Sequence, residues 1–402
     1  MILVDLSHTS HTRARTGIQR VARCLTRELE AASQGAPVTW DPHAGHWRAL
    51  ESWEHATLAG ERPGHSRGTS WPLGARLRGR WRRLSRGGPG LPAQPTGSPA
   101  GALLPELFSP AVAAALPALR AAQPGPVVAL FHDAIALRRP ALFPRQTVAR
   151  FPSYLRELAG LDGVAAVSED SRRCLSEYWD WLGLKDRPPL IHLTPGIDAP
   201  APPQAPAARD TGLPEQGNST RDPELLCLCT LEGRKNHLAL LEACESLWTL
   251  GHRFRLHLVG LARRESAGEA LARIESLRAA GRPLRHSGAV DEAGLEEAYA
   301  ACDLTVYPSL EEGYGLPVVE SLIRGKPCMC SANGALGEIS RGGGCLSLGG
   351  LDAGNLAASL SLLLRSPELR SQLRCEAAAR KFRSWKACSE ELVAWMGTLP
   401  RR

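Results

Sequence analysis

Several signatures of common function classes are absent from this 402-residue sequence. No apolar run approaches the roughly 20 residues that a membrane-spanning helix needs. No G-x-G-x-x-G follows a strand-like segment and no G-x-x-x-x-G-K-[ST] occurs, which argues against dinucleotide-binding and P-loop sites. No Asp-x-Asp pair occurs either. The sequence therefore gives no support for a divalent cation clamped onto a diphosphate, and we expect neither a metal nor a bound cofactor.

The eleven cysteines form no C-x-x-C pair. Cys227 and Cys229 alternate within a strand-like run, as do Cys328 and Cys330, so each pair shares one face of its strand. Small, buried apolar residues explain this pattern better than a metal site does. A reduced, cytoplasmic compartment is expected, and the first residues show neither the basic region nor the cleavage site of a signal peptide.

The length of the chain favours two domains, because 402 residues exceed one ordinary core. In both halves short apolar runs alternate with segments of helical periodicity, which indicates parallel sheets covered by helices. A stretch rich in proline and alanine, residues 199–223, separates the halves as a linker or loop. The expected strands are residues 2–6, 127–131, 163–167, 190–193, 224–230, 254–259, 304–307 and 326–330. The expected helices are residues 18–32, 169–178 behind a Ser168 N-cap, 237–250, 264–280, 291–301 and one from residue 317.

One run, Glu-Glu-Gly-Tyr-Gly-Leu-Pro-Val-Val-Glu, ends at Glu320 and follows an expected strand. Pro317 suits the first position of a helix, and the two glycines let a ligand approach the backbone closely. The N–H groups of the first helical turn then form an anion site. We expect Glu320 in that first turn and Glu312 just before it. A phosphate held by amides and flanked by two carboxylates that accept from hydroxyl groups is the pattern of a nucleotide-sugar site.

A pair of cations opens the helix after the first strand of the second half, in the segment Thr-Leu-Glu-Gly-Arg-Lys-Asn-His. Arg234 and Lys235 can reach a diphosphate from this turn. Solvated basic residues at a helix start are the simpler interpretation, but cations fit poorly at the positive end of a helix dipole. The sequence therefore predicts an anion at this turn. Without a metal, these two cations and the helix N–H groups must absorb the charge of a leaving diphosphate.

Two residues of the first half also follow strands. His132 ends the apolar run 127–131, where it either forms a structural hydrogen bond or lies beside a reacting carbon as a proton acceptor. Gly17 lies at a strand-to-helix turn, where a phosphate or sugar can sit close to the backbone, although a turn glycine explains it equally well. In open α/β sheets ligands bind beyond the carboxyl ends of the strands, and all these motifs obey that rule.

An arginine-rich insertion occupies residues 60–90, and its densest part is Arg76–Arg86. Trp71 and Trp81 are interleaved with the arginines, and Glu61 is the nearby counter-charge. Two interpretations remain open: a solvated insertion, or a patch that contacts anionic lipid headgroups with the tryptophans at the interface. Nucleic acid is not an expected partner, since no nucleic-acid-binding motif accompanies the basic run.

Taken together, these residues resemble the family-4 glycosyltransferases, which are retaining enzymes of the GT-B architecture. The E-x7-E motif matches at Glu312 and Glu320, and the Glu-x-Arg-Lys-Asn turn matches at residues 232–236. The stretch 299–309 is similar to the family's segment before the glutamates. Further segments are similar to a bacterial subgroup found in surface-polysaccharide assembly: 16–21, 131–133 and 167–171.

The resemblance implies a role for each matching residue. Glu312 would bond sugar hydroxyls and support positive charge at the anomeric carbon, and His132 would sit by the donor sugar near the acceptor. Glu320 would bind the ribose. The donor-binding set implied in this way consists of Lys235, Arg234, Glu320, Gly315, Leu316, Gly17 and Tyr314.

The resemblance also implies the architecture: two Rossmann-like domains facing each other across a cleft. Residues 1–198 would be the acceptor-side domain and residues 224–384 the nucleotide-sugar domain. The last segment, residues 385–402, would form a helix that packs back onto the first domain.

The implied activity is that of a cytoplasmic, retaining, metal-independent hexosyltransferase. It would move a hexose, by family habit mannose, from a nucleotide-diphosphate donor to a growing, lipid-linked polysaccharide such as O-antigen lipopolysaccharide. This work would take place in a bacterium, at the inner face of the membrane. The alternatives are another GT-B enzyme, a nucleotide-sugar epimerase or a phosphorylase, and a catalytically silent scaffold.

Overall fold

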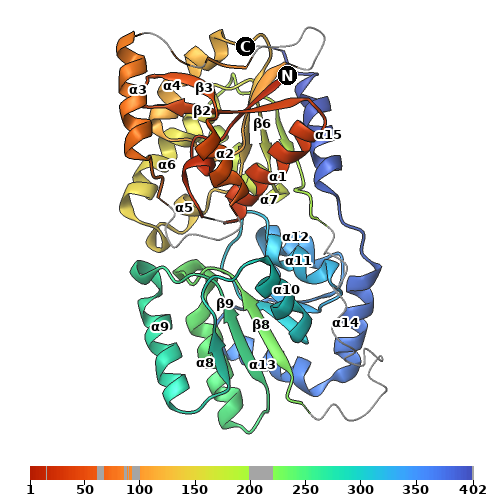
Figure 1. The fold of residues 1–402 in the computed structure, drawn as a ribbon. Coiled ribbons are helices and arrows are strands. Elements are labelled where there is room, and N and C mark those ends of the chain that lie inside the picture. Colours follow the sequence, from red (N-terminus) through yellow and green to blue (C-terminus); the bar gives the residue numbers. More distant parts are fainter. Residues whose placement is uncertain are drawn as a thin grey trace. The chain divides into compact units, whose positions relative to one another are not determined.

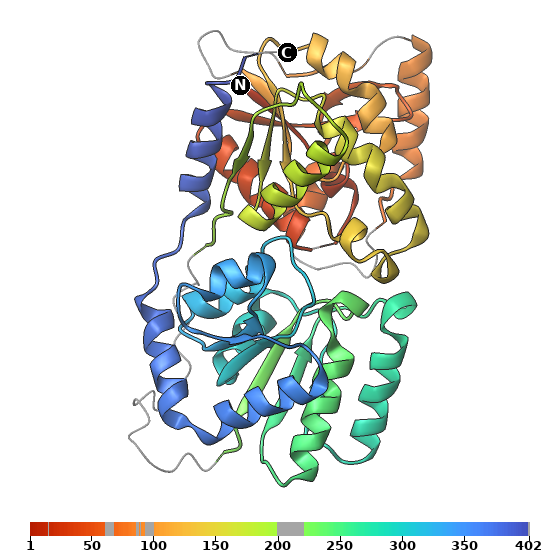
Figure 2. The ribbon, with the colours of Figure 1, turned by 180° about the vertical axis from the view of Figure 1, so that it is seen from behind.

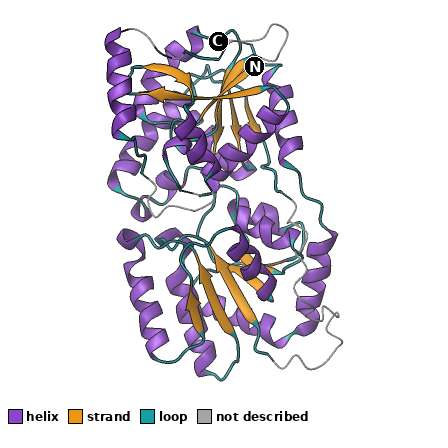
Figure 3. Ribbon diagram, in the orientation of Figure 1, coloured by secondary structure: helices purple, strands orange, loops and turns teal. Residues whose placement is uncertain are grey.

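The structure, a computed structural model, describes residues 1–14, 16–60, 68–85, 88, 90–92, 100–198 and 221–400. The chain divides into two compact units (Figure 1). Unit 1 comprises Met1–Gly196 and Arg383–Arg402, and unit 2 comprises Ile197–Phe382. In each unit the strands are enclosed by helices (Figure 3). The bulk of the linker, residues 199–220, lies outside the described residues.

The sheet of unit 1 has the strand order β3-β2-β1-β4-β5-β6-β7. All neighbours are parallel except β2 and β3 at one edge, which pair antiparallel. The strand β5 reads Val-Val-Ala-Leu-Phe and is buried throughout, as expected for a parallel strand covered on both faces. The strands are β1 (Ile2–Asp5), β2 (Gly35–Asp41), β3 (His46–Ala49), β4 (Gly101–Leu104), β5 (Val127–Phe131), β6 (Gly163–Ala166) and β7 (Leu190–His192).

Two helices of unit 1 begin with side-chain caps that the sequence provides. Thr16 and Gln19 form a capping box at the start of α1. The hydroxyl of Ser168 accepts from the Ser171 N–H at 3.1 Å and caps α7, as the sequence predicts. The helices are η1 (Thr9–His11), α1 (Gly17–Ala31), α2 (Ser52–Ala59), α3 (Leu73–Ser85), α4 (Pro110–Ala121), α5 (Ile135–Arg138), η2 (Pro140–Leu142), α6 (Arg145–Leu158), α7 (Glu169–Trp181) and α15 (Trp385–Met396).

The sheet of unit 2 is parallel, with the order β10-β9-β8-β11-β12-β13. The strands β8 and β11 are neighbours at its centre, so their carboxyl ends lie next to each other. The strands are β8 (Glu224–Leu228), β9 (Arg255–Val259), β10 (Leu284–His286), β11 (Leu304–Tyr307), β12 (Cys328–Ser331) and β13 (Cys345–Leu348). The helices are η3 (Gly233–Lys235), α8 (His237–Thr249), α9 (Arg264–Ala279), α10 (Glu292–Ala301), α11 (Leu316–Ile323), α12 (Gly334–Ser340), α13 (Ala353–Arg365) and α14 (Pro367–Ala379).

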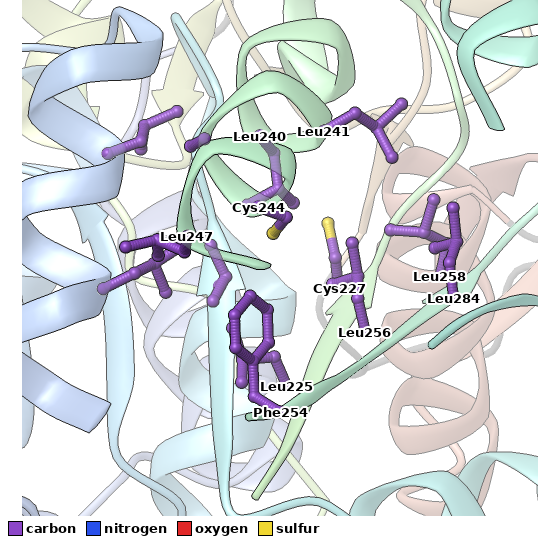
Figure 4. Close-up of a cluster of buried hydrophobic side chains, with 14 of the residues drawn as sticks. Leu225, Cys227, Leu240, Leu241, Cys244, Leu247, Phe254, Leu256, Leu258 and Leu284 are labelled. Carbon is purple, nitrogen blue, oxygen red and sulfur yellow. The ribbon is translucent and has the colours of Figure 1, made fainter. Parts of the chain in front are cut away.

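The main core of unit 2 lies between α8 and the sheet (Figure 4). Leu240 and Leu247 of α8 pack in one buried cluster with Leu225, Leu256 and Leu258 of the strands. Such tight packing fixes the end of β8 and the start of α8, and therefore also the turn between them.

The predicted α/β class is confirmed, and the expected strands and helices end within a few residues of the observed ones. The prediction missed the strands β2, β3, β4, β10 and β13, and it missed the helices α2 to α6 and α12 to α14 as well as the three short 3-10 helices. The final helix α15 belongs to unit 1, where it contacts α1 (Figures 1 and 2). Among the described residues, no helix combines the length and apolar character needed to cross a bilayer.

Candidate functional site

Two cations and one carboxylate meet at the carboxyl edge of the unit 2 sheet. Lys235 Nζ forms an ion pair with Glu312 Oε1, and Arg234 Nη1 lies 2.9 Å from Glu312 Oε2. The cations follow β8 and the carboxylate follows β11, the neighbouring strand. The Leu310 N–H also donates to the Arg234 carbonyl at 2.9 Å, which fastens the two loops together. The residues are therefore held by backbone as well as by charge.

The Arg234 guanidinium belongs to a wider network. Its Nε lies 2.7 Å from Glu232 Oε1, and Arg263 Nη1 lies 3.5 Å from the other oxygen of Glu232. Three cations thus share two carboxylates. The cluster carries one formal positive charge in excess, so it remains suited to an additional anion.

The environment of Glu312 determines its ionisation. Burial disfavours the charged form, but the charges of Lys235 and Arg234 outweigh burial and lower the pKa of Glu312 to about 2. The side chain of Lys235 is only 8% exposed, and that of Glu312 is 12% exposed. The sequence predicts an anion beside the two cations, and within the protein this anion is the Glu312 carboxylate.

The start of α11 supplies hydrogen-bond donors. Val318 N–H donates to the Gly315 carbonyl at 3.0 Å, and Pro317 has no N–H. In the part of the chain that the structure describes, the N–H groups of Gly315 and Leu316 have no acceptor. These two amides follow Glu312 by three and four residues, so they form a candidate anion site on the same loop.

Gly315 is required by its surroundings. Its φ of +110° lies in the left-handed region, which disfavours any side chain. A Cβ at this position would also come within 2.5 Å of Leu336 Cδ2 in α12. The missing side chain therefore makes room for a neighbouring helix, whereas the sequence analysis assigned that room to a ligand.

Glu320 is held by its neighbours. The hydroxyl of Tyr299 donates to Glu320 Oε2 at 3.2 Å, and the residue is 3% exposed. The sequence predicts Glu320 in the first turn of this helix. The helix begins at Leu316, so Glu320 lies in its second turn and that prediction is wrong. Tyr314, on the loop before the helix, packs against a buried apolar cluster that includes Val318.

His132 and Gly17 lie in unit 1. The Nε2–H of His132 donates to the Pro105 carbonyl at 2.7 Å, and burial lowers the pKa of the imidazole, which is therefore neutral. This tautomer leaves Nδ1 as an acceptor. Gly17 is the first residue of α1, directly after the Thr16 cap.

Two buried carboxylates that the sequence analysis missed lie at the carboxyl edge of the unit 1 sheet. Asp5 ends β1, and Glu106 follows the adjacent strand β4. Burial, reinforced by the charge of Asp5, raises the pKa of Glu106 to about 8, and burial raises that of Asp5 to about 6. A carboxylate two residues after an apolar strand is the signal that could have identified Glu106. The sequence pattern does not predict the strand β4 itself.

One group of side chains near Lys235 has the composition of a metal site. The Sγ atoms of Cys227 and Cys229 are 3.8 Å apart, and His237 Nε2 lies 3.4 Å from Cys229 Sγ. Cys227 also belongs to the apolar core, as predicted. A second group of that kind, Cys328 with Cys330 and Cys345, lies among the strands β12 and β13.

The match to a protein family covers the second unit. Residues 209–381 match the model described as "Glycosyl transferases group 1". The matched range includes Arg234, Lys235, Glu312 and Glu320, the residues whose geometry is described above.

Curated relatives extend the similarity to the first unit. The serotype-specific mannosyltransferase WbdA of Escherichia coli is 28% identical over 340 residues, which are 80% of this chain and 37% of that protein. The O-antigen chain mannosyltransferase B of Escherichia coli is 30% identical over 173 residues, which are 42% of this chain and 44% of that protein. The chain therefore spans less than half the length of these relatives.

The fold has solved counterparts. HepE from Anabaena, in complex with UDP and glucose, superimposes with a TM-score of 0.68 at 15% identity, covering 99% of each chain. At this identity the likeness shows the fold alone, which is the GT-B architecture that the family resemblance implies.

Proposed function

We propose that this chain, whose residues 209–381 match the model of the group 1 glycosyltransferases, is a retaining mannosyltransferase that acts without a metal ion. Its donor would be a nucleotide-diphosphate mannose. Its acceptor would be a growing, lipid-linked polysaccharide of the cell surface. The similarity to two mannosyltransferases, one of them named an O-antigen chain mannosyltransferase, supports the sugar and the acceptor class.

The observation that carries the proposal is the convergence of Arg234 and Lys235 on Glu312, which precedes the amides of Gly315 and Leu316 on the same loop. A diphosphate carries more charge than one carboxylate, so it can compete for both cations. We propose that the diphosphate takes Lys235 and Arg234 as partners when the donor binds. The charge that develops on the leaving group would then be stabilised by two cations and two amides.

Glu312 would acquire its catalytic role through this exchange. Released from its ion pairs, its carboxylate can accept hydrogen bonds from sugar hydroxyls and stabilise positive charge at the anomeric carbon. While it is paired with the two cations its pKa is about 2, so Glu312 is already ionised before the donor binds. Glu320, held in place by Tyr299, would bind the ribose.

Unit 1 would contribute acceptor-side residues. His132 offers Nδ1 as a proton acceptor or an orienting group, because its Nε2–H is committed to Pro105. Gly17 would allow close approach of the donor at the start of α1. We place the enzyme in the cytoplasm, a proposal that the eleven free cysteines support.

Product analysis with the full chain tests this function. The protein is incubated with guanosine-diphosphate mannose, uridine-diphosphate glucose or other common donors, and with a mannoside on a lipid-like aglycone. We expect a new glycosidic bond with the anomeric configuration of the donor, read by NMR, and an unchanged rate in EDTA. Lys235→Met should lower kcat about 10²–10³-fold, since it removes one preorganised charge from the leaving group.

Other products would overturn the proposal. An isomerised donor would indicate an epimerase, and a sugar phosphate would indicate a phosphorylase. Absence of nucleoside-diphosphate binding in calorimetry would indicate a silent scaffold. The variant Lys185→Met, which changes an exposed lysine in unit 1, is the control and should leave turnover unchanged.

A further inference from the structure

The helix α3 turns its large apolar side chains outward. Leu73, Leu77, Trp81 and Leu84 are 72%, 56%, 68% and 85% exposed. They make up more than half of the large hydrophobic residues exposed among the described residues. The residues that α3 buries are Ala75 and Gly79, which are small. A helix that only completes a core shows the opposite arrangement.

The spacing of these residues makes one continuous stripe. At 100° per residue, the four large apolar side chains fall within an arc of about 80°. Ala75 and Gly79 lie on the opposite side of the helix. The arrangement is therefore a property of the whole helix face.

Close packing fixes the orientation of the helix. A Cβ at Gly79 would come within 2.6 Å of His43 Cβ and 3.2 Å of Asp41 Oδ1, so this side of the helix touches the loop after β2. Arg78 Nη2 and Arg82 Nη1 both pair with Glu51, at 2.8 Å and 2.5 Å. The helix cannot roll to bury its leucines without breaking these contacts.

The charge around the stripe is of one sign. The helix contains no acidic residue. Arg76, Arg80 and Arg83 are exposed and flank one side of the apolar stripe, and none of them pairs with a carboxylate of the described residues. Exposed apolar residues bordered by arginines that have no carboxylate partner among the described residues suit a surface that is apolar inside and anionic at its boundary.

We propose that α3 is a docking surface for an anionic lipid bilayer. Its leucines and Trp81 would enter the boundary between headgroups and acyl chains, while its arginines contact the phosphates. The helix is held rigidly to unit 1 by its buried small residues, by their contact with the loop after β2 and by the two arginine ion pairs with Glu51. This inference stands independently of the proposed donor and acceptor, because vesicle binding requires no turnover.

Sedimentation of the full chain with vesicles tests the surface. The vesicles contain either phosphatidylglycerol with phosphatidylcholine, or phosphatidylcholine alone. We expect binding to the anionic vesicles that weakens with salt, and little binding to the neutral ones. The variant Leu77→Ser/Leu84→Ser should lower the partition coefficient about tenfold or more, and Arg76→Gln/Arg80→Gln/Arg83→Gln about a hundredfold.

Matched controls use residues that are equally exposed elsewhere. Leu250→Ser removes a leucine that is 76% exposed in unit 2, and Arg253→Gln removes an arginine whose side chain is 83% exposed. Both should bind vesicles like the unmodified protein. Circular dichroism and the thermal midpoint must match for all variants, which is expected because every substituted side chain is exposed.

Two outcomes would overturn the proposal. In the first, the unmodified protein does not sediment with anionic vesicles, or the α3 variants sediment as well as it does. In the second, the protein is a dimer in analytical ultracentrifugation and the leucine variant is monomeric with undiminished vesicle binding. The stripe would then be an interface between two copies of the chain.

Discussion

The ion pairs of Glu312 should contribute measurably to stability, and Glu312→Gln tests this. The substitution keeps the shape of the side chain and removes its charge, so Lys235 and Arg234 lose their shared carboxylate. The pKa of Glu312 falls from 4.5 to about 2 in the folded protein. At 1.36 kcal/mol per unit, this corresponds to about 3 kcal/mol of stability at neutral pH.

The sign of the effect is set by the lowered pKa. The unfolded chain binds a proton at Glu312 more readily than the folded chain does, so the contribution is complete above pH of about 4.5 and is lost as the pH falls towards 2. The difference between the unmodified protein and Glu312→Gln should therefore shrink to about 2 kcal/mol at pH 3.5. Near neutral pH the thermal midpoint of unit 2 should fall by about 6–12 °C.

Urea unfolding, followed by circular dichroism at pH 7 and pH 3.5, measures both values. Glu169→Gln is the control: its ion pair with Arg172 spans 2.7 Å, but the two side chains are 49% and 36% exposed. That variant should lose less than about 0.5 kcal/mol. Equal stability of Glu312→Gln and the unmodified protein at pH 7, or a difference that does not change with pH, would refute the reasoning.

Two further changes have outcomes that follow from the geometry. Gly315→Ala places a Cβ at a left-handed φ and against Leu336, so the free energy of unfolding of unit 2 should fall by about 2 kcal/mol or more. Urea unfolding measures this loss. An unchanged midpoint would contradict the packing described at this turn. Glu106 has a folded pKa of about 8 against 4.5 unfolded, so its protonation stabilises unit 1 below pH of about 4.5, and this stabilisation is lost as the pH rises to about 8. Between pH 5 and pH 8.5 the free energy of unfolding should therefore fall less in Glu106→Gln than in the unmodified protein, by up to about 5 kcal/mol. An unaltered pH slope would contradict the raised pKa of Glu106.

The sequence alone was sufficient to predict that the charged residues of unit 2 lie close to one another. Lys235 and Glu312 follow two apolar runs, and the carboxyl ends of neighbouring parallel strands meet at one edge of a sheet. Sequence reasoning treated the cations as phosphate ligands and Glu312 as a sugar ligand. It did not foresee that the three would pair with one another, because side-chain pairing depends on distances that the sequence does not contain.

The parts that were missed have identifiable causes. The strand β4 is only four residues long and follows a stretch rich in glycine and proline, so Glu106 had no recognisable strand before it. In α3 both interpretations of the sequence rest on the arginines and tryptophans, and neither takes account of the leucines between them. Their exposure became visible only with the packing of Gly79 against the loop after β2.

The placement of α15 has a consequence for biogenesis. This helix packs on α1 and buries Trp385, Leu392 and Met396, yet it is translated after the whole of unit 2. While the ribosome is still making unit 2, the apolar surface that receives α15 stays uncovered. Unit 1 can therefore finish its core only after the second unit has emerged, and a fragment cut after Gly196 would expose the same surface permanently.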